Sequence, residues 1–288
     1  MTYTLYLGDR SYSSWSLRAW LICEVFDLPI SKTYVDFSKD SVADQLRDIA
    51  PARTVPTLKT PEGSIISESL AIAEELATRF PDAPLWPSDP GLRATARSLA
   101  SEMHSGFGAL REACPMNLRV AYDGFEVSKA VAADVARVEL IWRDALARSG
   151  GPWLCGDYSI ADAFFAPVAM RIATYGLPIG PEASAYVAAH LAHKPFRRWR
   201  AMGLVRGEIL PWYKRDVATR PWPGPTPLDA APTEDASGCV NTACPYSGDP
   251  VTHFMVFEGR TFGFCNAFCR DKTVPDPEAW EKFMAIAR

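Results

Sequence analysis

The chain has 288 residues, 48% of them apolar, which is enough for about two globular domains with buried cores. The formal net charge is -4, and no run of Lys or Arg is interleaved with aromatic residues. We therefore expect no nucleic-acid partner. The longest apolar runs fall short of the roughly 20 residues that a membrane span needs, and the N-terminus, MTYTLYLGDR, shows no signal-peptide pattern. We therefore expect a cytoplasmic protein with no membrane among its partners.

The first 82 residues alternate the signals of strands and helices. In chain order they predict a strand at 2–8, a helix within 11–28, a strand at 32–37, two short extended runs that turn at Glu62-Gly63, and a helix at 69–80. The strand, helix, strand order is that of a βαβ unit. Residues 1–82 are thus expected to form one α/β domain.

The chain changes character twice after this domain. From residue 88 to 222 apolar residues recur at three- and four-residue steps and strand signals are absent, which predicts an all-helical domain. Residues 223–236 are rich in proline and predict a semi-extended linker. Residues 237–288 combine two β-like runs, four cysteines and a terminal helix, and we expect a separate small module there.

Two local features of the first domain point to a ligand site. Pro56 follows Val55 at the start of a strand, where a cis peptide bond would form a tight turn and expose the backbone of Val55. Ser67 and Glu68 stand at the start of a helix, whose free N–H groups and positive dipole attract a carboxylate. A plain helix cap explains the same serine and glutamate equally well.

Four motifs in chain order resemble a glutathione S-transferase over residues 1–215. They are LYLGDRSYSSWSLRAWL, RTVPTL, SESLAIAEEL and YSIADAFFAPV. The resemblance implies a thioredoxin-like N-terminal domain and an all-helical C-terminal domain. It also implies that glutathione lies along the first domain, that a small electrophile enters the cleft beside it, and that the protein is a homodimer.

The resemblance also assigns site residues. The family's backbone contact to the cysteinyl part of glutathione falls on Val55, before cis Pro56, and its γ-glutamyl contact falls on Glu68 and Ser69. The stretch SIAD, Ser159 to Asp162, matches the family's buried capping box, in which serine and aspartate hold the start of a core helix. That box is expected to be structural.

The catalytic hydroxyl falls in the serine-rich stretch SYSSWS. The register of bacterial members selects Ser13, a zeta-like register selects Ser11, and Ser14 is a third choice, whereas Tyr12 is expected to point away. One hydroxyl suffices, because a hydrogen bond to a charged acceptor contributes about 1.5–3 kcal/mol and so lowers a thiol pKa by roughly one to two units. The serine is thus expected to stabilise the glutathione thiolate without becoming a covalent nucleophile.

Four of the seven cysteines gather near the C-terminus as C-x4-C, twenty residues, C-x3-C: Cys239, Cys244, Cys265 and Cys269. In a reducing compartment this spacing favours a structural zinc over disulfides, the alternative being buried free thiols. So short a segment buries little apolar area, and a metal would supply the missing stability.

The cysteine segment also resembles the YHS or TRASH family of small metal-binding modules, through CPYSGDPV, FEGRTFGFC and DPEAWEKF. That family's pattern falls on Cys244, Cys265 and Cys269. It leaves the fourth ligand open between Cys239 and His253, and we expect Cys239. The whole chain is then predicted to be a glutathione S-transferase with a zinc module. The rival hypothesis is a non-catalytic glutathione-binding or metal-sensing protein whose module recognises a partner.

Overall fold

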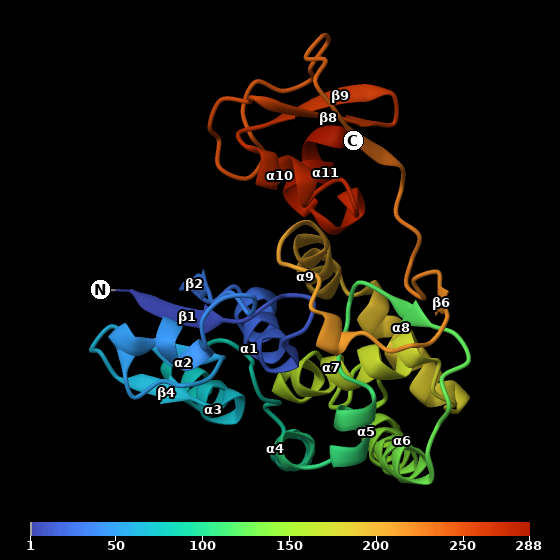
Figure 1. The fold of residues 1–288 in the computed structure, drawn as a ribbon. Helices are drawn as coiled ribbons and strands as arrows, with labels where there is room; N and C mark the ends of the chain where they lie inside the picture. Colours follow the sequence, from blue (N-terminus) through green and yellow to red (C-terminus); the bar gives the residue numbers. More distant parts are fainter. Residues whose placement is uncertain (1) are drawn as a thin grey trace. The chain divides into compact units, whose positions relative to one another are not determined.

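The structure is a computed structural model, and it describes residues 2–288 (Figure 1). The chain divides into two compact units. The first holds the residues up to Leu191 together with Glu208–Pro223, and the second holds Ala192–Gly207 together with Gly224–Arg288. The chain therefore leaves the first unit, returns to it, and leaves it again.

The first unit begins with a four-stranded sheet and its helices. In chain order these are β1 (Tyr3–Leu7), α1 (Ser14–Val25), β2 (Ile30–Tyr34), α2 (Val42–Gln45), η1 (Arg47–Ile49), β3 (Thr57–Lys59), β4 (Ile65–Ser67) and α3 (Ser69–Arg79). The strand order is β2-β1-β3-β4, with β1 parallel to β2 and the other pairs antiparallel. The predicted βαβ unit and the turn at Glu62-Gly63 are confirmed, and Gly63 takes the positive φ of 96° that glycine adopts without steric cost.

The rest of the first unit is built mainly of helices, as the sequence predicts. They are α4 (Pro90–Ser105), α5 (Gly108–Ala113), α6 (Lys129–Ser149), α7 (Ile160–Tyr175) and α8 (Pro181–Ala192). All 16 residues of α7 are buried, and α7 packs against both α1 and α4. The predicted capping box is present at its start, where the Ser159 N–H donates to the Asp162 carboxylate at 2.9 Å. Within residues 2–288 no helix combines the length and apolar character of a membrane span.

A short ladder departs from the prediction that residues 88–222 hold no strand. β5 (Ala121–Tyr122) pairs antiparallel with β6 (Thr219–Arg220). The Arg220 guanidinium donates to the carbonyls of Tyr122 at 2.8 Å and Ala173 at 2.7 Å, which fastens the returning segment to the helices. Two residues per strand are too few for an alternating pattern, so the sequence carries no signal of this pairing.

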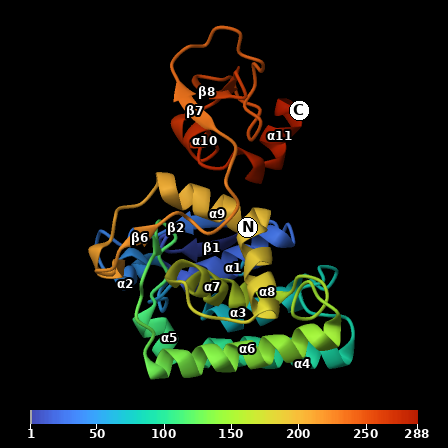
Figure 2. The ribbon, with the colours of Figure 1, turned by 90° about the vertical axis from the view of Figure 1, so that its right-hand side faces the viewer.

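The second unit contains a three-stranded sheet and short helices. They are α9 (Lys194–Val205), β7 (Ala230–Thr233), β8 (His253–Phe257), β9 (Arg260–Phe264), α10 (Ala267–Asp271), η3 (Pro277–Ala279) and α11 (Glu281–Ala287), with strand order β7-β8-β9 (Figure 2). The predicted hairpin is β8–β9. Its aromatic side chains pack with Phe283 of α11, whose ring centroid lies 5.4 Å from Phe257, 5.2 Å from Phe262 and 6.0 Å from Phe264.

The predicted linker and α9 both contribute to this unit. β7 lies inside the proline-rich stretch and pairs with β8 as an edge strand, a position that tolerates Pro232. The sequence groups α9 with the helices of residues 88–222, but the structure groups it with the C-terminal unit. The cause is a nearly buried ion pair: Arg197 of α9 donates two hydrogen bonds to Asp276, at 2.6 and 2.8 Å. Their side chains are 13% and 9% exposed.

We expect Asp276→Ala to lower the free energy of unfolding of the second unit by up to about 3 kcal/mol, because the largely buried Arg197 guanidinium loses two hydrogen bonds and keeps only Glu278, 3.8 Å away, as a counter-charge. Urea unfolding followed by tryptophan fluorescence measures the change. Glu281→Ala is the control, since Glu281 pairs with Lys194 on the surface, where such a pair contributes at most about 1 kcal/mol. Equal effects of the two substitutions would contradict the assignment of α9 to this unit.

Candidate active site and thiol cluster

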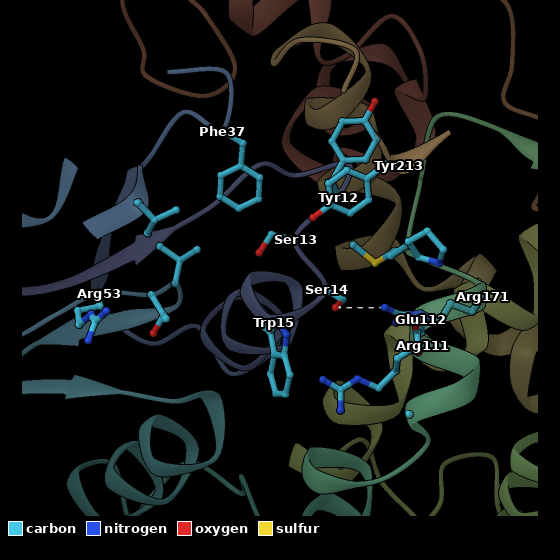
Figure 3. Close-up of a pocket in the computed structure, with 16 residues that line it drawn as sticks. Tyr12, Ser13, Ser14, Trp15, Phe37, Arg53, Arg111, Glu112, Arg171 and Tyr213 are labelled. Carbon is cyan, nitrogen blue, oxygen red and sulfur yellow. Dashed lines mark hydrogen bonds between the residues drawn. The ribbon is translucent and has the colours of Figure 1, made fainter. Parts of the chain in front are cut away.

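A cleft of about 640 Å³ lies at the N-terminus of α1 in the first unit (Figure 3). Its lining comes from the α1 start, the loop after β2, the segment before β3, α5, α7 and the returning segment. Tyr12 and Tyr213 stack at one side with ring centroids 4.7 Å apart. Tyr12 thus lines the cleft, although the sequence predicted that it would point away, because the chain bends here where an extended segment was assumed.

Ser13 is the N-cap of α1 and lines the cleft. Its Oγ accepts a hydrogen bond from the Ser16 N–H at 3.3 Å and donates one to Ser16 Oγ at 2.8 Å. Ser16 Oγ in turn accepts from the Gly8 N–H at the end of β1, at 2.8 Å. The start of the helix is therefore anchored to the sheet, and the free N–H groups and positive dipole end of α1 face the cleft.

The other two candidate serines occupy different places. Ser14 lines the cleft, and its Oγ accepts a hydrogen bond from Arg171 Nη2 at 3.4 Å. In Figure 3 Ser14 faces Arg171, whereas Ser13 lies on the side of Arg53 and Phe37. Ser11 is 1% exposed, does not line the cleft, and donates its backbone N–H to Asp9 at 2.7 Å.

The four residues predicted to hold glutathione lie together. Val55, Pro56, Glu68 and Ser69 line a pocket of about 250 Å³ whose other walls are Trp15 and Thr54. Trp15, Thr54 and Val55 also line the larger cleft, so the two spaces adjoin.

Two details of this pocket matter for binding. The Val55-Pro56 bond is cis, as the sequence predicts, and Val55 stands before the ladder that starts at Thr57. At the start of α3, Glu68 has a positive φ of 71°, and the Ser69 hydroxyl is buried without a hydrogen-bond partner. A buried hydroxyl beside free helix N–H groups offers hydrogen-bond donors to an anionic ligand group.

Three arginines cluster around the same cleft. Arg171 of α7 and Arg111 of α5 line it, and Arg18 of α1 is 1% exposed, with its guanidinium over the rings of Trp15 at 4.3 Å and Phe164 at 5.0 Å. Within residues 2–288 none of the three forms an ion pair with a carboxylate.

The pKa values of these arginines reflect the same lack of counter-charge. Burial lowers the pKa of Arg18 well below its usual value, and the positive charges of Arg171 and Arg111 lower it further. Burial, with the charge of Arg111, lowers the pKa of Arg171 to about 10. The sequence did not single out Arg171, although it is the one charged side chain within the apolar run AFFAPVAMRIATY, and that was the available signal.

The second unit brings together three of the four predicted cysteines. The Sγ atoms of Cys244, Cys265 and Cys269 all lie within 4.8 Å of one another, and those of Cys265 and Cys269 are 3.9 Å apart. Tetrahedral zinc with Zn–S bonds of about 2.3 Å separates its sulfurs by about 3.8 Å, so the cluster has the size that zinc needs.

Hydrogen-bond donors surround two of these sulfurs, those of Cys244 and Cys265, whereas burial raises the pKa of the Cys269 thiol to about 12. Burial alone would raise the pKa of the Cys244 thiol, but backbone N–H groups of Cys265, Tyr246 and Ser247 donate to it and lower its pKa to about 7. Cys265 Sγ accepts from Ser247 Oγ at 3.3 Å and from Asn266 Nδ2 at 3.2 Å. Donors aimed at sulfur favour the thiolate, which is the form that binds metal.

Neither Cys239 nor His253 belongs to this cluster. The Cys239 thiol donates to the Asn241 carbonyl at 3.2 Å. The Asn241 side chain in turn bridges Ala243 O and the backbone of Gly263, with three hydrogen bonds of 2.8 to 2.9 Å. These hydrogen bonds of Asn241 hold the chain next to Cys239 along β9. The cysteine spacing predicts Cys239 as the fourth ligand, but the structure does not place its sulfur in the cluster of the other three.

Comparison with known proteins identifies the family. The profile of "Glutathione S-transferase, N-terminal domain" matches residues 12–79. A "Probable maleylacetoacetate isomerase" of Caenorhabditis elegans is 30% identical over 208 residues, which are 66% of this chain and 94% of that relative. The chain belongs to the glutathione S-transferase family.

Other similarities agree with this assignment. The transferase is 26% identical over 202 residues to a maleylacetoacetate isomerase of Pseudomonas aeruginosa, covering 67% of this chain and 93% of the relative. It is 25% identical over 181 residues to a "Stringent starvation protein A homolog" of Coxiella burnetii, covering 63% and 81%. Its fold matches glutathione transferase Omega 3C from Trametes versicolor with a TM-score of 0.54, at 20% identity over 73% of this chain and 91% of the other. The transferase fold with its helical domain is thus confirmed, and the protein is a glutathione transferase-like enzyme.

We expect Arg18→Met to raise the free energy of unfolding of the ligand-free transferase by about 1 kcal/mol or more, because a side chain of similar length replaces a buried charge that has no counter-ion. The measurement is urea denaturation. Arg137→Met removes an exposed arginine that pairs with Glu102 and should change stability by at most about 1 kcal/mol. A large loss of stability in the Arg18 variant would show that its contacts with the two rings outweigh its desolvation.

Proposed function

We propose that the protein binds glutathione in the pocket beside Ser69 and activates its thiol at the N-terminus of α1 for attack on a small electrophile in the adjoining cleft. One observation carries this proposal. The N-terminus of α1, with the hydroxyls of Ser13 and Ser14, adjoins the smaller pocket, and that pocket also reaches the N-terminus of α3 at Ser69. Two of the relatives are named maleylacetoacetate isomerase, so isomerisation through a glutathione adduct belongs to the same class of reaction.

Glutathione would be held at both ends of the smaller pocket. Its γ-glutamyl carboxylate fits the N–H groups at the start of α3 and the unpaired Ser69 hydroxyl, and its ammonium fits the Glu68 carboxylate. The cysteinyl backbone would pair with Val55, which the sheet ladder leaves unused. This placement directs the thiol toward Trp15 and the start of α1, because those residues border both spaces.

Ser13 is the hydroxyl that we assign to the thiolate. The Ser13 hydroxyl donates to Ser16 Oγ. If it rotates to donate to the glutathione sulfur, it loses this neutral hydrogen bond, which contributes about 0.5–1.5 kcal/mol. A bond to the thiolate is worth about 1.5–3 kcal/mol, so the exchange favours the thiolate. The dipole of α1 adds to this preference. Ser14 is held toward Arg171 and is assigned to the electrophile side of the cleft.

We expect Ser13→Ala to raise the pKa of bound glutathione by about one to two units and to slow conjugation, with little change in glutathione affinity. The pKa is measured from the ultraviolet absorbance of the bound thiolate against pH. Ser69→Ala is the matched control, since it removes the same atom from the other end of the ligand and should weaken binding without moving that pKa. A pKa shift in Ser11→Ala or Ser14→Ala, and none in Ser13→Ala, would reassign the hydroxyl.

The rival function is a glutathione-binding protein without turnover. Glutathione should raise the melting temperature of the protein in either case. Conjugation of a generic electrophile above the uncatalysed rate is expected only of the enzyme. Binding with no conjugation would favour the rival.

We further propose that Cys244, Cys265 and Cys269 bind one structural zinc ion. The size of the cluster and the donors directed at two of its sulfurs, Cys244 and Cys265, fit such an ion, and three protein ligands leave one coordination position for water or another group. A zinc ion here would hold the turn at Cys244 to the start of α10. It would stabilise the second unit without taking part in the reaction at Ser13.

We expect metal analysis to find one zinc per chain, lost in Cys269→Ser and retained in Cys239→Ser. Cobalt replacement gives an independent measurement, because the intensity of the thiolate charge-transfer band reports the number of sulfur ligands. Three sulfurs per cobalt is the expected result. Loss of one sulfur ligand in Cys239→Ser would instead mean that the fourth cysteine reaches the metal, as the spacing in the sequence predicts.

A further inference from the structure

We propose that the metal site of Cys244, Cys265 and Cys269 takes its fourth ligand from solution, and that this ligand is the thiolate of glutathione or of a similar small anionic thiol. The inference rests on the zinc site of the proposed function. It goes beyond that site by naming the chemical class of the missing ligand. It also gives the chain a second place for a thiol, in the second unit, besides the pocket beside Ser69.

The protein supplies no fourth ligand in the part of the chain that the structure describes. No further Cys, His, Asp or Glu joins the three thiols within 4.8 Å. The two candidates from the sequence are engaged elsewhere. The Cys239 thiol donates to the Asn241 carbonyl at 3.2 Å. The Thr252 hydroxyl donates to the Cys265 carbonyl at 2.9 Å, which leaves its oxygen to accept from His253 Nδ1, also at 2.9 Å.

The cluster is accessible from one side. Two of its thiols are buried, at 2% and 9% exposure, whereas Cys265 is partly exposed. The sulfur of Cys265 accepts from the exposed residues Ser247 and Asn266. Gly248 follows Ser247 in the turn, and a Cβ placed on it would meet no heavy atom within 4 Å beyond its chain neighbours. A ligand from solution therefore reaches the metal site on the side of Cys265, where the chain leaves room.

The charges near the cluster favour an anionic ligand. Lys272 stands three residues after Cys269, and its positive charge acts against the rise that burial causes in the pKa of that thiol. Asp271, on the same short helix, is already paired with Arg270 at 2.8 Å. Asp249, in the turn, is exposed, so water screens its charge. Lys272 thus offsets part of the negative charge that a fourth thiolate adds.

The chemistry of zinc favours sulfur over water in this position. Soft thiolate ligands suit zinc, and four sulfurs around the ion are a common structural set. A free thiol has a pKa of about 8.5, but a thiol that coordinates a metal loses its proton. In the exchange the S–H bond breaks, the sulfur–metal bond forms, water leaves the metal, and the proton passes to the buffer. No oxidant or reductant is needed. Glutathione fits the site because it carries one thiol and a net negative charge.

The test uses the full-length protein loaded with cobalt(II), whose thiolate charge-transfer band counts sulfur ligands. We expect glutathione to raise the band intensity per cobalt by about one third, from three sulfurs to four, with the cobalt still bound to the protein after gel filtration. S-methylglutathione, which has no free thiol, should cause no rise. Ser69→Ala should leave the rise intact, because Ser69 lies in the other glutathione pocket.

Three results would overturn the proposal. A band of four sulfurs before any thiol is added would show that the protein provides the fourth ligand. An unchanged band in the presence of glutathione would show that water or another group keeps the position. Loss of cobalt from the protein would show that glutathione competes with the three cysteines and does not join them.

A comparison of two thiols tests the part played by Lys272. The anion 2-mercaptoethanesulfonate and the cation thiocholine have the same length between sulfur and charge. With affinities referred to the thiolate form, we expect the anion to bind the cobalt-loaded protein about threefold more tightly. Lys272→Gln should abolish this preference, and Lys282→Gln, at an exposed position of α11, should retain it. The cobalt spectrum before thiol addition verifies the site in each variant, and equal affinities for the two thiols in the unchanged protein would overturn the role of Lys272.

The outcomes separate this inference from the proposed function. A protein that binds neither zinc nor cobalt would refute the metal site and the fourth ligand together. Cobalt held by three sulfurs and indifferent to glutathione would retain the metal site and refute the fourth ligand alone. The pKa of glutathione bound beside Ser13 is measured independently, so neither result decides the reaction of the first unit.

Discussion

The first unit depends on the complete burial of α7. Asp162 at its start accepts hydrogen bonds from the Leu154 and Ser159 N–H groups and from the Tyr186 hydroxyl, at 2.9 to 3.0 Å. Burial still raises the pKa of this carboxyl to about 6, so the bonds only partly offset its desolvation. Because α7 packs against both α1 and α4, the capping box at its start helps to position the helices of the first unit against α1, the helix that follows β1.

The same helix reaches the cleft near its other end. About two and a half turns after Asp162, Arg171 reaches the cleft and Ser14. The start of α1 is tied to β1 through Ser16 and Gly8. The N-terminus of α1 is therefore held by hydrogen bonds both to the sheet and to α7. Because α1 is fixed by hydrogen bonds to β1 and α7, the donors at its N-terminus need no reorganisation when an anion binds. Such preorganised donors are the condition for electrostatic stabilisation of a thiolate or another anion.

The second unit is organised around two small centres. An aromatic cluster at Phe283 joins the β8–β9 hairpin to α11, and the three thiols join the turn at Cys244 to α10. The paired Arg197 and Asp276 then attach α9 to this unit. In sequence, α9 lies between α8 and the segment that returns to the first unit. By packing and charge it belongs instead to the second unit, with the residues that follow the proline-rich stretch.

Local patterns in the sequence determined the elements that depend on near neighbours: the βαβ unit, the turn at Gly63, the SIAD capping box, and the approach of Cys265, just before α10, to Cys269 within it. These follow from periodicity and from contacts a few residues apart. Tertiary structure alone decided which serine faces Arg171, that Cys239 lies apart from the other thiols, and that α9 pairs with Asp276. Each of those outcomes depends on groups that are distant in sequence, and their approach is set by packing that no local pattern encodes.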